Sequence, residues 1–322
     1  MDILVFGSLN MDLVARVARL PLPGETLMGS GFVTVPGGKG ANQAVAAARL
    51  GASVAMVGRV GDDGFGERLR SHLQGENIDT HSVNISTQQP SGTALIAVAP
   101  DNNQIIVISG ANGEVGETEL KRLIPYFEQA KVLLLQFEVP LPVVQKAAAL
   151  AYQAGLLVIV DPAPAQGKLT REFCKHISVL TPNQTEAGLL TGMEVVNRRS
   201  AITAAESLHQ QGIDTVIVKL GKQGGVCVTS SGSFEFSAFT VEAVDTVAAG
   251  DAFNGGLAAA LCQTKATDSG TALSDYDLLR SIIRYANAVA ALAVTRPGAQ
   301  SAMPTAAEVK VFLDQFKPLA VQ

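Results

Sequence analysis

VLLLQFEVPLPVVQKAAALAYQAGLLVIV, residues 132–160, contains the pattern that decides the fold. Two short apolar runs, VLLLQ at 132–136 and LLVIV at 156–160, are typical of strands that are buried on both faces. Residues 142–154 between them have the pattern of a helix. A strand, a helix and a second strand in this order predict one unit of a parallel sheet with a right-handed crossover.

The same alternation extends outward from this unit in both directions. Further strands are expected at ILVF (3–6), VAMVG (54–58), ISVL (177–180) and TVIVK (215–219), and further helices at 41–50, 64–74 and 201–211. The pattern predicts an α/β protein with a mostly parallel sheet and helices on both of its faces. Since there is no internal repeat and no linker rich in Pro, Gly or Ser, we expect a single domain over residues 1–322.

Two segments, 13–36 and 92–108, lack a helical pattern and interrupt the alternation. TALIAVAPDNNQIIVI, residues 93–108, predicts a hairpin with its turn at residues 100–103. Both segments are expected to insert antiparallel strands that form a small sheet. Such a sheet has one face to cover, so it would fold over a pocket as a lid or pair with another chain. The polar residues 263–277 are expected to form a surface loop.

Composition and charge narrow the classes of function. With 47% hydrophobic residues among 322, the chain has ample material for a large core. The net charge of −5 argues against a general nucleic-acid-binding surface. Three cysteines, Cys174, Cys227 and Cys262, lack metal-ligand spacing and are typical of a reducing compartment. The first residues show neither a signal peptide nor a membrane span, so we expect a soluble, cytoplasmic protein.

DTVAAGDAF, residues 245–253, opens a long apolar helix with an acid in its first turn. The small residues Ala248, Ala249 and Gly250 leave backbone N–H groups accessible to a phosphoryl group. Asp251 would then take a proton from a hydroxyl that attacks this phosphate. The alternative is that Asp251 only complements the helix dipole, and this stretch alone leaves both interpretations open.

Two glycine- and amide-containing stretches suit a polyhydroxylated ligand. In VPGGKGANQAVAAARLG, residues 35–51, a glycine-rich loop enters a helix, and Lys39 and Asn42 can donate to hydroxyl groups. It lacks the Walker A pattern. In GSLNMD, residues 7–12, Asn10 and Asp12 share one face of an extended chain. The alternatives are a glycine turn that serves chain geometry and an Asx turn that ends a strand.

Two further stretches favour a nucleotide or its metal, each with a plain structural alternative. In TPNQTEAGLLTG (181–192), Asn183 and Glu186 can meet at a helix start and contact a Mg²⁺-phosphate, or they can be ordinary caps. In KLGKQGGVCV (219–228), the glycines allow a nucleotide to lie against the backbone, although a simple hairpin explains them equally. Glu138, after the 132–136 strand, could be a plain loop acid.

Taken together and in order, these stretches resemble the ribokinase family of sugar and nucleoside kinases from about residue 3 to about residue 316. The resemblance rests on GSLNMD, GGKGANQAVAAARLGA, VGDDGFG, QFEVP, DPAPA, TPNQTEA, DTVAAGDAFNGGLAAAL and AVTRPGAQ. It implies a ribokinase-like three-layer αβα sandwich with a small β-sheet lid formed by segments 13–36 and 92–108. The implied reaction is transfer of a phosphoryl group from ATP to the 5-hydroxyl of D-ribose, and the lids of two subunits would pair in a homodimer.

The resemblance also implies roles for individual residues. Asp251 is the implied general base, and Ala248, Ala249 and Gly250 form the implied anion hole for the γ-phosphate. The implied sugar site consists of Asn10, Met11, Asp12, Gly38, Lys39, Gly40, Ala41, Asn42, Glu138 and Asp251. The implied ATP site consists of Asn183, Lys219, Leu220, Gly221, Lys222, Gln223, Gly224, Gly250, Asp251 and Asn287. Asn183 and Glu186 match a motif associated with Mg²⁺ and phosphate.

A monovalent cation, usually potassium, is implied beside the anion hole. Its implied ligands, mostly backbone carbonyls, come from Asp245, Val247, Ala293, Arg296 and Gly298. Relatives often carry a serine after AVTRxGAQ, and here the serine is shifted by one position, which leaves open whether Ser301 or Ala302 completes the site. Lys219 and Asn287 stand where a threonine and a histidine can occur, so altered contacts to the base are expected.

Several alternatives remain at this stage. A fructokinase or a deoxyribokinase shares the phosphate motifs, whereas Asn10, Asp12, Lys39 and Asn42 favour ribose. A non-catalytic sugar or nucleotide sensor would be expected to lose the base, which is present as Asp251. A nicotinamide dehydrogenase is not expected, since no G-x-G-x-x-G follows the first strand.

Overall fold

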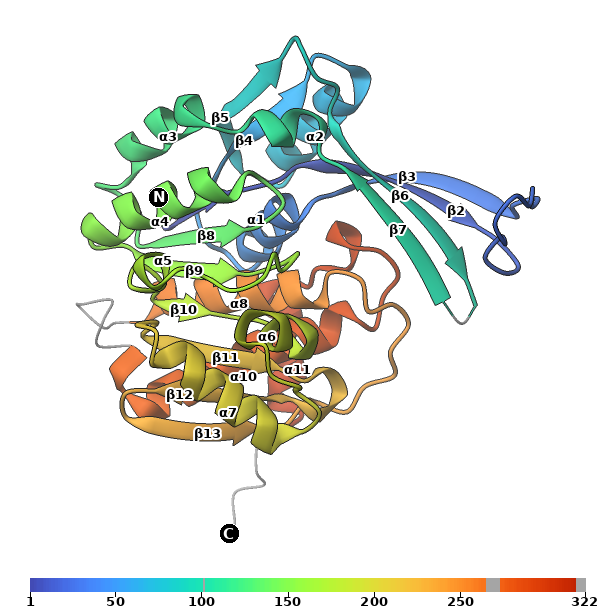
Figure 1. Cartoon of the computed structure of the whole chain (residues 1–322). Helices are drawn as coiled ribbons and strands as arrows, with labels where there is room; N and C mark the ends of the chain where they lie inside the picture. The colour runs from blue at the N-terminus through green and yellow to red at the C-terminus, as the bar shows by residue number, and fades with distance from the viewer. Residues whose placement is uncertain (101, 265–272, 317–322) are drawn as a thin grey trace.

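Two sheets form the framework of the computed structural model, which describes residues 1–100, 102–264 and 273–316 (Figure 1). The larger has nine strands in the order β13-β12-β11-β10-β9-β8-β1-β4-β5. All neighbours are parallel except β11-β12 and β12-β13. The strands are β1 (Ile3–Phe6), β4 (Val54–Gly61), β5 (Asp79–Ser86), β8 (Val132–Gln136), β9 (Leu157–Asp161), β10 (Val179–Leu180), β11 (Thr215–Lys219), β12 (Gly225–Thr229) and β13 (Gly232–Phe236). The predicted mostly parallel α/β sheet is confirmed.

Helices cover both faces of this sheet and produce three layers. Alternate strand residues point to opposite faces, so that Ile3 and Val5 join one apolar core while Leu4 and Phe6 join the other. The first core is completed by α1 (Lys39–Arg49), α2 (Gly64–Gly75), α8 (Ala249–Gln263), α10 (Tyr276–Ala293) and α11 (Ala306–Asp314). The second is completed by α3 (Glu117–Leu123), α4 (Leu141–Gln153), α5 (Arg171–Cys174), α6 (Gln184–Thr191) and α7 (Arg198–His209). The three-layer αβα sandwich implied by the resemblance is therefore confirmed.

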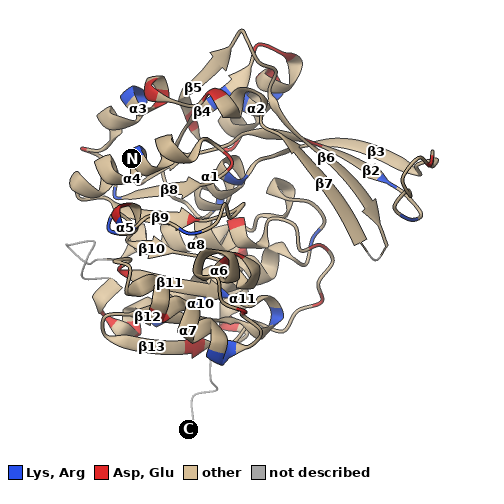
Figure 2. Ribbon diagram, viewed as in Figure 1, with Lys and Arg blue, Asp and Glu red and all other residues tan. Residues whose placement is uncertain are grey.

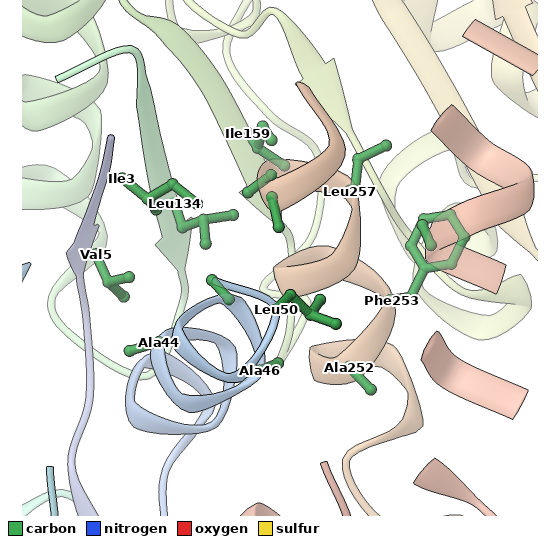
Figure 3. Packing of buried hydrophobic residues seen from close by; sticks show 14 of the residues in the cluster. Ile3, Val5, Ala44, Ala46, Leu50, Leu134, Ile159, Ala252, Phe253 and Leu257 are labelled. Atoms are coloured by element: carbon green, nitrogen blue, oxygen red, sulfur yellow. The ribbon is translucent and has the colours of Figure 1, made fainter. Parts of the chain in front are cut away.

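Helices α1 and α8 pack closely against each other on the sheet (Figure 3). Side chains of α1 such as Ala46 meet α8 at Gly255, where an added Cβ would lie only 2.5 Å from the Ala46 Cβ. Only glycine permits this approach without displacement of a helix. The contact holds the two helices in a fixed register, and it brings polar residues near the start of α1 beside the first turn of α8.

The smaller sheet projects from the sandwich and has the strand order β3-β2-β6-β7 (Figure 1). Its strands are β2 (Asn10–Arg16), β3 (Gly31–Gly37), β6 (Gly92–Ala99) and β7 (Asn102–Ile108). The predicted antiparallel pairs β2-β3 and β6-β7 are confirmed, but the central pair β2-β6 is parallel. This follows because β2 continues from β1 and β6 from β5, and both of these strands run in one direction in the large sheet.

Other sequence predictions differ from the structure in detail. Strands β5 and β13 and helices α3, α5, α10 and α11 were not predicted. Part of the predicted loop 263–277 and part of the predicted turn at 100–103 lie outside the described residues, although α8 reaches Gln263 and α10 begins at Tyr276. Within the described ranges, none of the helices has the length and apolar character that crossing a membrane requires. Lys and Arg are interspersed with Asp and Glu along the ribbon (Figure 2).

Candidate active site

A large cavity of about 750 Å³ lies where the carboxyl ends of the parallel strands meet the beginning of α8. This is the position at which open α/β sheets bind ligands. The cavity is lined by Lys39, Asp161, Asn183, Glu186, Lys219, Gly221, Lys222, Gly224, Phe236, Ala238, Phe239, Thr240, Val241, Ala243, Thr246, Ala248, Ala249, Gly250, Asp251, Phe253, Asn287, Ala290, Ala291 and Val294. Its wall thus combines charged groups, bare backbone and apolar side chains.

Asp251, in the first turn of α8, is a buried carboxylate at the edge of this cavity. It is 3% exposed. One carboxylate oxygen accepts from Asn42 Nδ2 at 2.9 Å, and the other accepts from Gln43 Nε2 at 3.1 Å. Burial raises the pKa of Asp251 above its usual range; Lys39 opposes the shift, and the negative charge of Asp161 adds to it. A fixed carboxylate with an increased affinity for protons is suited to general base chemistry.

The start of α8 offers unused backbone donors beside Asp251. Ala248, the residue that precedes the helix, has φ 59° and forms no side-chain cap. Within the described ranges, the N–H groups of Gly250 and Asp251 have no hydrogen-bond acceptor, and that of Ala249 has only a long bond of 3.4 Å to Thr246 O. Because unpaired N–H groups and the helix dipole both favour negative charge, this turn is suited to binding a phosphoryl group.

Two lysines and a second buried carboxylate adjoin the base. Asp161, at the end of β9, is 2% exposed. Its carboxylate lies 3.4 Å from Lys219 Nζ and 3.5 Å from Lys39 Nζ. Burial raises the pKa of Asp161, but the two lysines outweigh it and the net shift is downward. Burial alone would lower the pKa of Lys39. The negative charges of Asp251 and Asp161 outweigh this effect, so the pKa of Lys39 is raised. The cluster therefore places the ammonium groups of two lysines beside two buried carboxylates.

A second polar cluster, near Asp251, joins the segments that follow β1 and β8. Glu138 Oε2 accepts from Ser8 Oγ at 2.6 Å and from Lys39 N at 3.0 Å, and it lies 3.4 Å from Asn10 Nδ2. Asn10 Oδ1 accepts from Asn112 Nδ2 at 2.7 Å. These bonds fix the orientation of the Asn10 amide and the Glu138 carboxylate, and Glu138 is therefore more than a plain loop acid.

Asp12 lies in strand β2 on the same face as Asn10, as predicted from their spacing. The residue is 9% exposed, and its carboxylate makes no hydrogen bond or ion pair within the part of the chain that the structure describes. Burial, aided by the nearby charges of Glu138 and Asp251, raises the pKa of Asp12 to about 7. A buried carboxylate without a partner is costly, so it is a candidate for binding ligand hydroxyl groups.

The glycine-rich loop at the start of α1 serves chain geometry and also positions the site. Gly38 has φ 89°, and a Cβ there would lie 2.7 Å from Asn10 N. A Cβ at Gly40 would lie 2.7 Å from Ser8 N. The loop therefore packs directly on the segment that carries Asn10. Met11 and Ala41 are buried in the core, which leaves only their backbone for a ligand.

Most of the residues predicted to bind a nucleotide line the large cavity, and an apolar wall faces them. The 3-10 turn η3 (Gly221–Gln223) brings Lys222 to the cavity, and Asn287 Nδ2 donates to Ser237 O at 2.8 Å. Leu220 and Gln223 are not among the lining residues. Leu220 is buried, and the carbonyl of Gln223 accepts from Arg198. Phe239, Val241, Ala243, Ala290, Ala291 and Val294 supply the apolar wall.

Asn183 and Glu186 meet at the start of α6 and form a reciprocal capping box. Asn183 N donates to Glu186 Oε2 at 2.7 Å, and Glu186 N donates to Asn183 Oδ1 at 2.8 Å. Both residues also line the large cavity, so the capping interpretation and a ligand-binding interpretation are compatible. Burial, together with the charge of Asp161, raises the pKa of Glu186.

Asp245 connects two loops beside the start of α8. Its carboxylate accepts from Val247 N at 3.0 Å and from Gly298 N at 2.9 Å. The carbonyl of Ala293 accepts from Arg296 N at 3.3 Å. The five residues predicted for a monovalent cation thus come from the loop before α8, from the end of α10 and from the loop that follows it.

Ser301, the serine that follows the AVTRPGAQ motif, lies beside the loop that contains Gly298. Ser301 Oγ donates to Pro297 O at 3.2 Å, and a Cβ at Gly298 would lie 2.5 Å from it. Ala302 is buried. The Ser301 hydroxyl, not Ala302, is therefore the side-chain oxygen next to this loop.

Several polar residues of the site were not predicted, Ser8 and Gln136 among them. Gln43 and Asp161 contact the base or its neighbours, Gln300 Nε2 donates to Asn42 Oδ1 at 3.0 Å, and Asn112 holds Asn10. Gln43, Asp161 and Gln300 each lie inside a motif that carries the family resemblance. The sequence signal that could have identified such residues is a polar residue inside an otherwise apolar helix or at the end of an apolar strand.

Comparison with known proteins agrees with this geometry. Residues 1–306 match the pfkB family of carbohydrate kinases. A ribokinase of Haemophilus influenzae is 42% identical over 311 residues, which cover 96% of this chain and 97% of the relative. A deoxyribokinase of Salmonella typhi is 35% identical over 97% of this chain and 99% of its own length. The structure of Arabidopsis thaliana ribokinase complexed with ribose and ATP has a TM-score of 0.84 and 30% identity, covering 97% of this chain and 98% of that chain. The chain therefore belongs to the pfkB family of carbohydrate kinases.

Proposed function

We propose that this protein transfers the γ-phosphoryl group of ATP to the 5-hydroxyl of D-ribose and releases D-ribose 5-phosphate and ADP. One observation is central. The buried carboxylate of Asp251 lines the large cavity with its bare helix N-terminus, and it is close enough to the polar cluster of Asn10, Asp12 and Glu138 to raise the pKa of Asp12. An acid in this position can accept a proton from a hydroxyl on one side as that oxygen attacks a phosphorus atom on the other. The relatives named ribokinase support ribose as the sugar.

In this mechanism Asp251 takes the proton of the 5-hydroxyl while the oxygen forms a bond to the γ-phosphorus and the bond to the β,γ-bridging oxygen breaks. Asn42 and Gln43 hold the carboxylate in orientation through their amide groups. The N–H groups of Gly250 and Asp251 stabilise the negative charge on the transferred group. Lys39 and Lys219 add positive charge at the same end of the cavity.

The residues present fit ATP and Mg²⁺. Two unpaired N–H groups and two ammonium groups face the proposed phosphate position, and the apolar wall around Phe239 suits an adenine ring. Both oxygens of Glu186 already accept from Asn183, so these two residues would hold the metal through its water shell. The bound metal would neutralise phosphate charge and orient the phosphates.

A monovalent cation beside Asp245 would order the loop before α8. The carboxylate already bridges two loops through backbone N–H groups, and the carbonyls of Val247, Ala293, Arg296 and Gly298 are the proposed ligands. Stimulation of turnover by K⁺ over Na⁺ at equal ionic strength tests this assignment. Equal rates in the two salts would contradict it.

We propose that the chain forms a single domain and that its smaller sheet has two roles. The sheet acts as a lid over the sugar, and it forms the contact between two copies of the chain. Its face opposite Asp12 carries the exposed side chains Phe32, Leu95, Ile106 and Ile108. An exposed apolar sheet surface of this kind is covered most simply by an equal surface of a second copy. A dimer mass by light scattering at micromolar concentration, lost in Ile106→Glu, is expected. Ile124→Glu, at another exposed isoleucine outside this sheet, is the control.

A cytoplasmic location is also proposed. Cys174 and Cys227 are buried free thiols, and burial raises their pKa values to about 11 and 12. Unreactive thiols without partners fit a reducing compartment. Cell fractionation tests this, and recovery of the protein outside the cytoplasm would contradict it.

The enzymatic test is a coupled assay of ADP release with ribose, 2-deoxyribose, fructose and adenosine as acceptors. Ribose is expected to be the preferred acceptor, and Asp251→Asn is expected to lower turnover on the order of 10²- to 10⁴-fold. The exposed Asp62→Asn serves as the matched control. Preference for 2-deoxyribose would assign the chain to the activity of its deoxyribokinase relative. Absence of turnover with all four acceptors would contradict the proposal.

A further inference from the structure

Asp161 and Lys219 form an ion pair, and the mechanism above gives no role to Asp161. Asp161 lies at the end of β9, and Lys219 ends the next strand but one, β11. Their charged atoms are 3.4 Å apart. Charge-assisted hydrogen bonds are commonly 2.7–2.9 Å long. The pair is thus close enough to attract but is not a tight bond, so the ammonium group is available for another partner.

The Lys219 ammonium group lies at the proposed phosphate position. It lines the large cavity, and its side chain is 15% exposed. A Cβ placed on Gly250 would lie 3.3 Å from Lys219 Nζ, so the ammonium group sits beside the first turn of α8. The unpaired N–H of Gly250 is in the same turn. A phosphate oxygen bound there would be within reach of both groups.

Asp161 is also connected to the base through a shared donor. Gln43 Nε2 donates to Asp161 Oδ2 at 3.2 Å and to Asp251 Oδ1 at 3.1 Å. Gln136 Nε2 donates to Gln43 Oε1 at 2.7 Å, which fixes the Gln43 amide with its nitrogen towards the two carboxylates. Lys39 Nζ lies 3.5 Å from Asp161 and 3.9 Å from Asp251. Asp161 therefore contacts Gln43 and Lys39, two of the groups that also contact the base.

We propose that Lys219 exchanges Asp161 for the terminal phosphates of bound ATP, and that Asp161 is a positioning residue which then holds Lys39 and Gln43 against Asp251. The inference rests on the proposed function, because it assumes that phosphates bind at the start of α8. Before ATP arrives, two carboxylates and two ammonium groups balance each other in this cluster. Afterwards the phosphates attract Lys219, and Asp161 retains Lys39.

The exchange predicts opposite effects of the two charge-removing variants on nucleotide binding. Lys219→Met should weaken binding of a non-hydrolysable ATP analogue on the order of tenfold to a hundredfold, the effect of losing a bond to a charged group. Asp161→Asn removes the competing partner of Lys219, so it should bind the analogue several-fold more tightly while kcat falls. Lys219→Arg keeps the charge and should retain the affinity. AMP, which lacks the terminal phosphates, should bind all variants with about equal affinity.

The experiment is calorimetric titration of the analogue and of AMP, without sugar, into the unmodified chain, the three single variants and the double variant D161N/K219M. In the double variant the gain from Asp161→Asn should disappear, because Lys219 is absent. If Asp161→Asn increases the affinity for the analogue equally with and without Lys219, the exchange is overturned. The increase would then come only from the removal of a negative charge. Equal weakening of AMP and of the analogue by either variant would also overturn it. The titrations need no sugar, so a wrong assignment of ribose would appear only in the kinase assay.

Discussion

The strongest test of the sugar site is the pH dependence of stability at Asp12. The folded chain raises the pKa of this carboxyl from 3.8 to about 7. Because the folded state keeps its proton to higher pH than the unfolded state does, the stability contribution of Asp12 is greatest below pH 4. This contribution falls as the pH rises from 3.8 to about 7, and it is constant above pH 7. At about 1.4 kcal/mol per pKa unit, the total loss is roughly 4 kcal/mol.

Asp12→Asn removes this titration and leaves an amide of nearly the same shape. Its unpaired amide adds a cost of about 1–3 kcal/mol that does not vary with pH. The informative quantity is therefore the difference in unfolding free energy between the unmodified chain and the variant as a function of pH. Between pH 5 and pH 8.5 this difference should move by roughly 2.5 kcal/mol in favour of the variant.

The assay is urea unfolding at several pH values in this range, with the exposed Asp62→Asn as the control for the substitution itself. Asp62→Asn should run parallel to the unmodified chain. If Asp12→Asn also runs parallel, the carboxyl is not buried without a partner, and the argument that it awaits ligand hydroxyl groups fails. In that case, a loss of ribose binding in Asp12→Asn would not by itself support the argument.

Three further predictions concern the ligand and the packing. If the sugar hydroxyl groups donate to the ionised form of Asp12, the affinity for ribose should fall about tenfold for each pH unit below 7. Calorimetric titration at several pH values measures this affinity. An unchanged affinity at pH 5.5 would contradict this. Gly255→Ala should destabilise the chain by about 1–3 kcal/mol because its Cβ would meet Ala46, whereas Gly75→Ala, where nothing lies within 4 Å, should be neutral or stabilising in denaturant melts. Asn112→Ala should weaken ribose binding on the order of tenfold, since Asn10 loses its partner, without changing the affinity for AMP.

The parallel strands were predictable because their signal is strong. Runs such as 132–136 and 215–219 are apolar throughout, as strands buried on both faces must be, and the structure starts and ends β8 and β11 at these residues. Strand β5, DTHSVNIS, was missed because it forms the edge of the sheet and carries mostly polar residues. The parallel pairing of β2 with β6 was missed because no local pattern records the direction in which two distant insertions leave a sheet.

Much of the polar site was predictable only as separate pieces. Asn42 and Asp251 were identified from two distant motifs, but the bond between them depends on the packing of α1 against α8 at Gly255. Asp161 and Gln43 gave a weaker signal, because a single polar residue in an apolar segment is ambiguous until its neighbours are known. Both are almost fully buried, and a buried amide or carboxylate requires partners. Those partners are supplied by other segments, which a single sequence does not identify.

The two interpretations of Asp251 now differ in what they explain. A carboxylate that only complements a helix dipole can remain in solvent near its own first turn. Asp251 is instead 3% exposed, and its oxygens accept from Asn42 and Gln43 of a different helix, while the N–H groups of Gly250 and Asp251 stay without acceptors in the described structure. Burying a carboxylate beside the charge of Asp161 destabilises its ionised form, as the raised pKa records. A dipole contribution of about 0.3–1 kcal/mol does not offset such a cost, whereas a proton-accepting role at a phosphate site requires this placement.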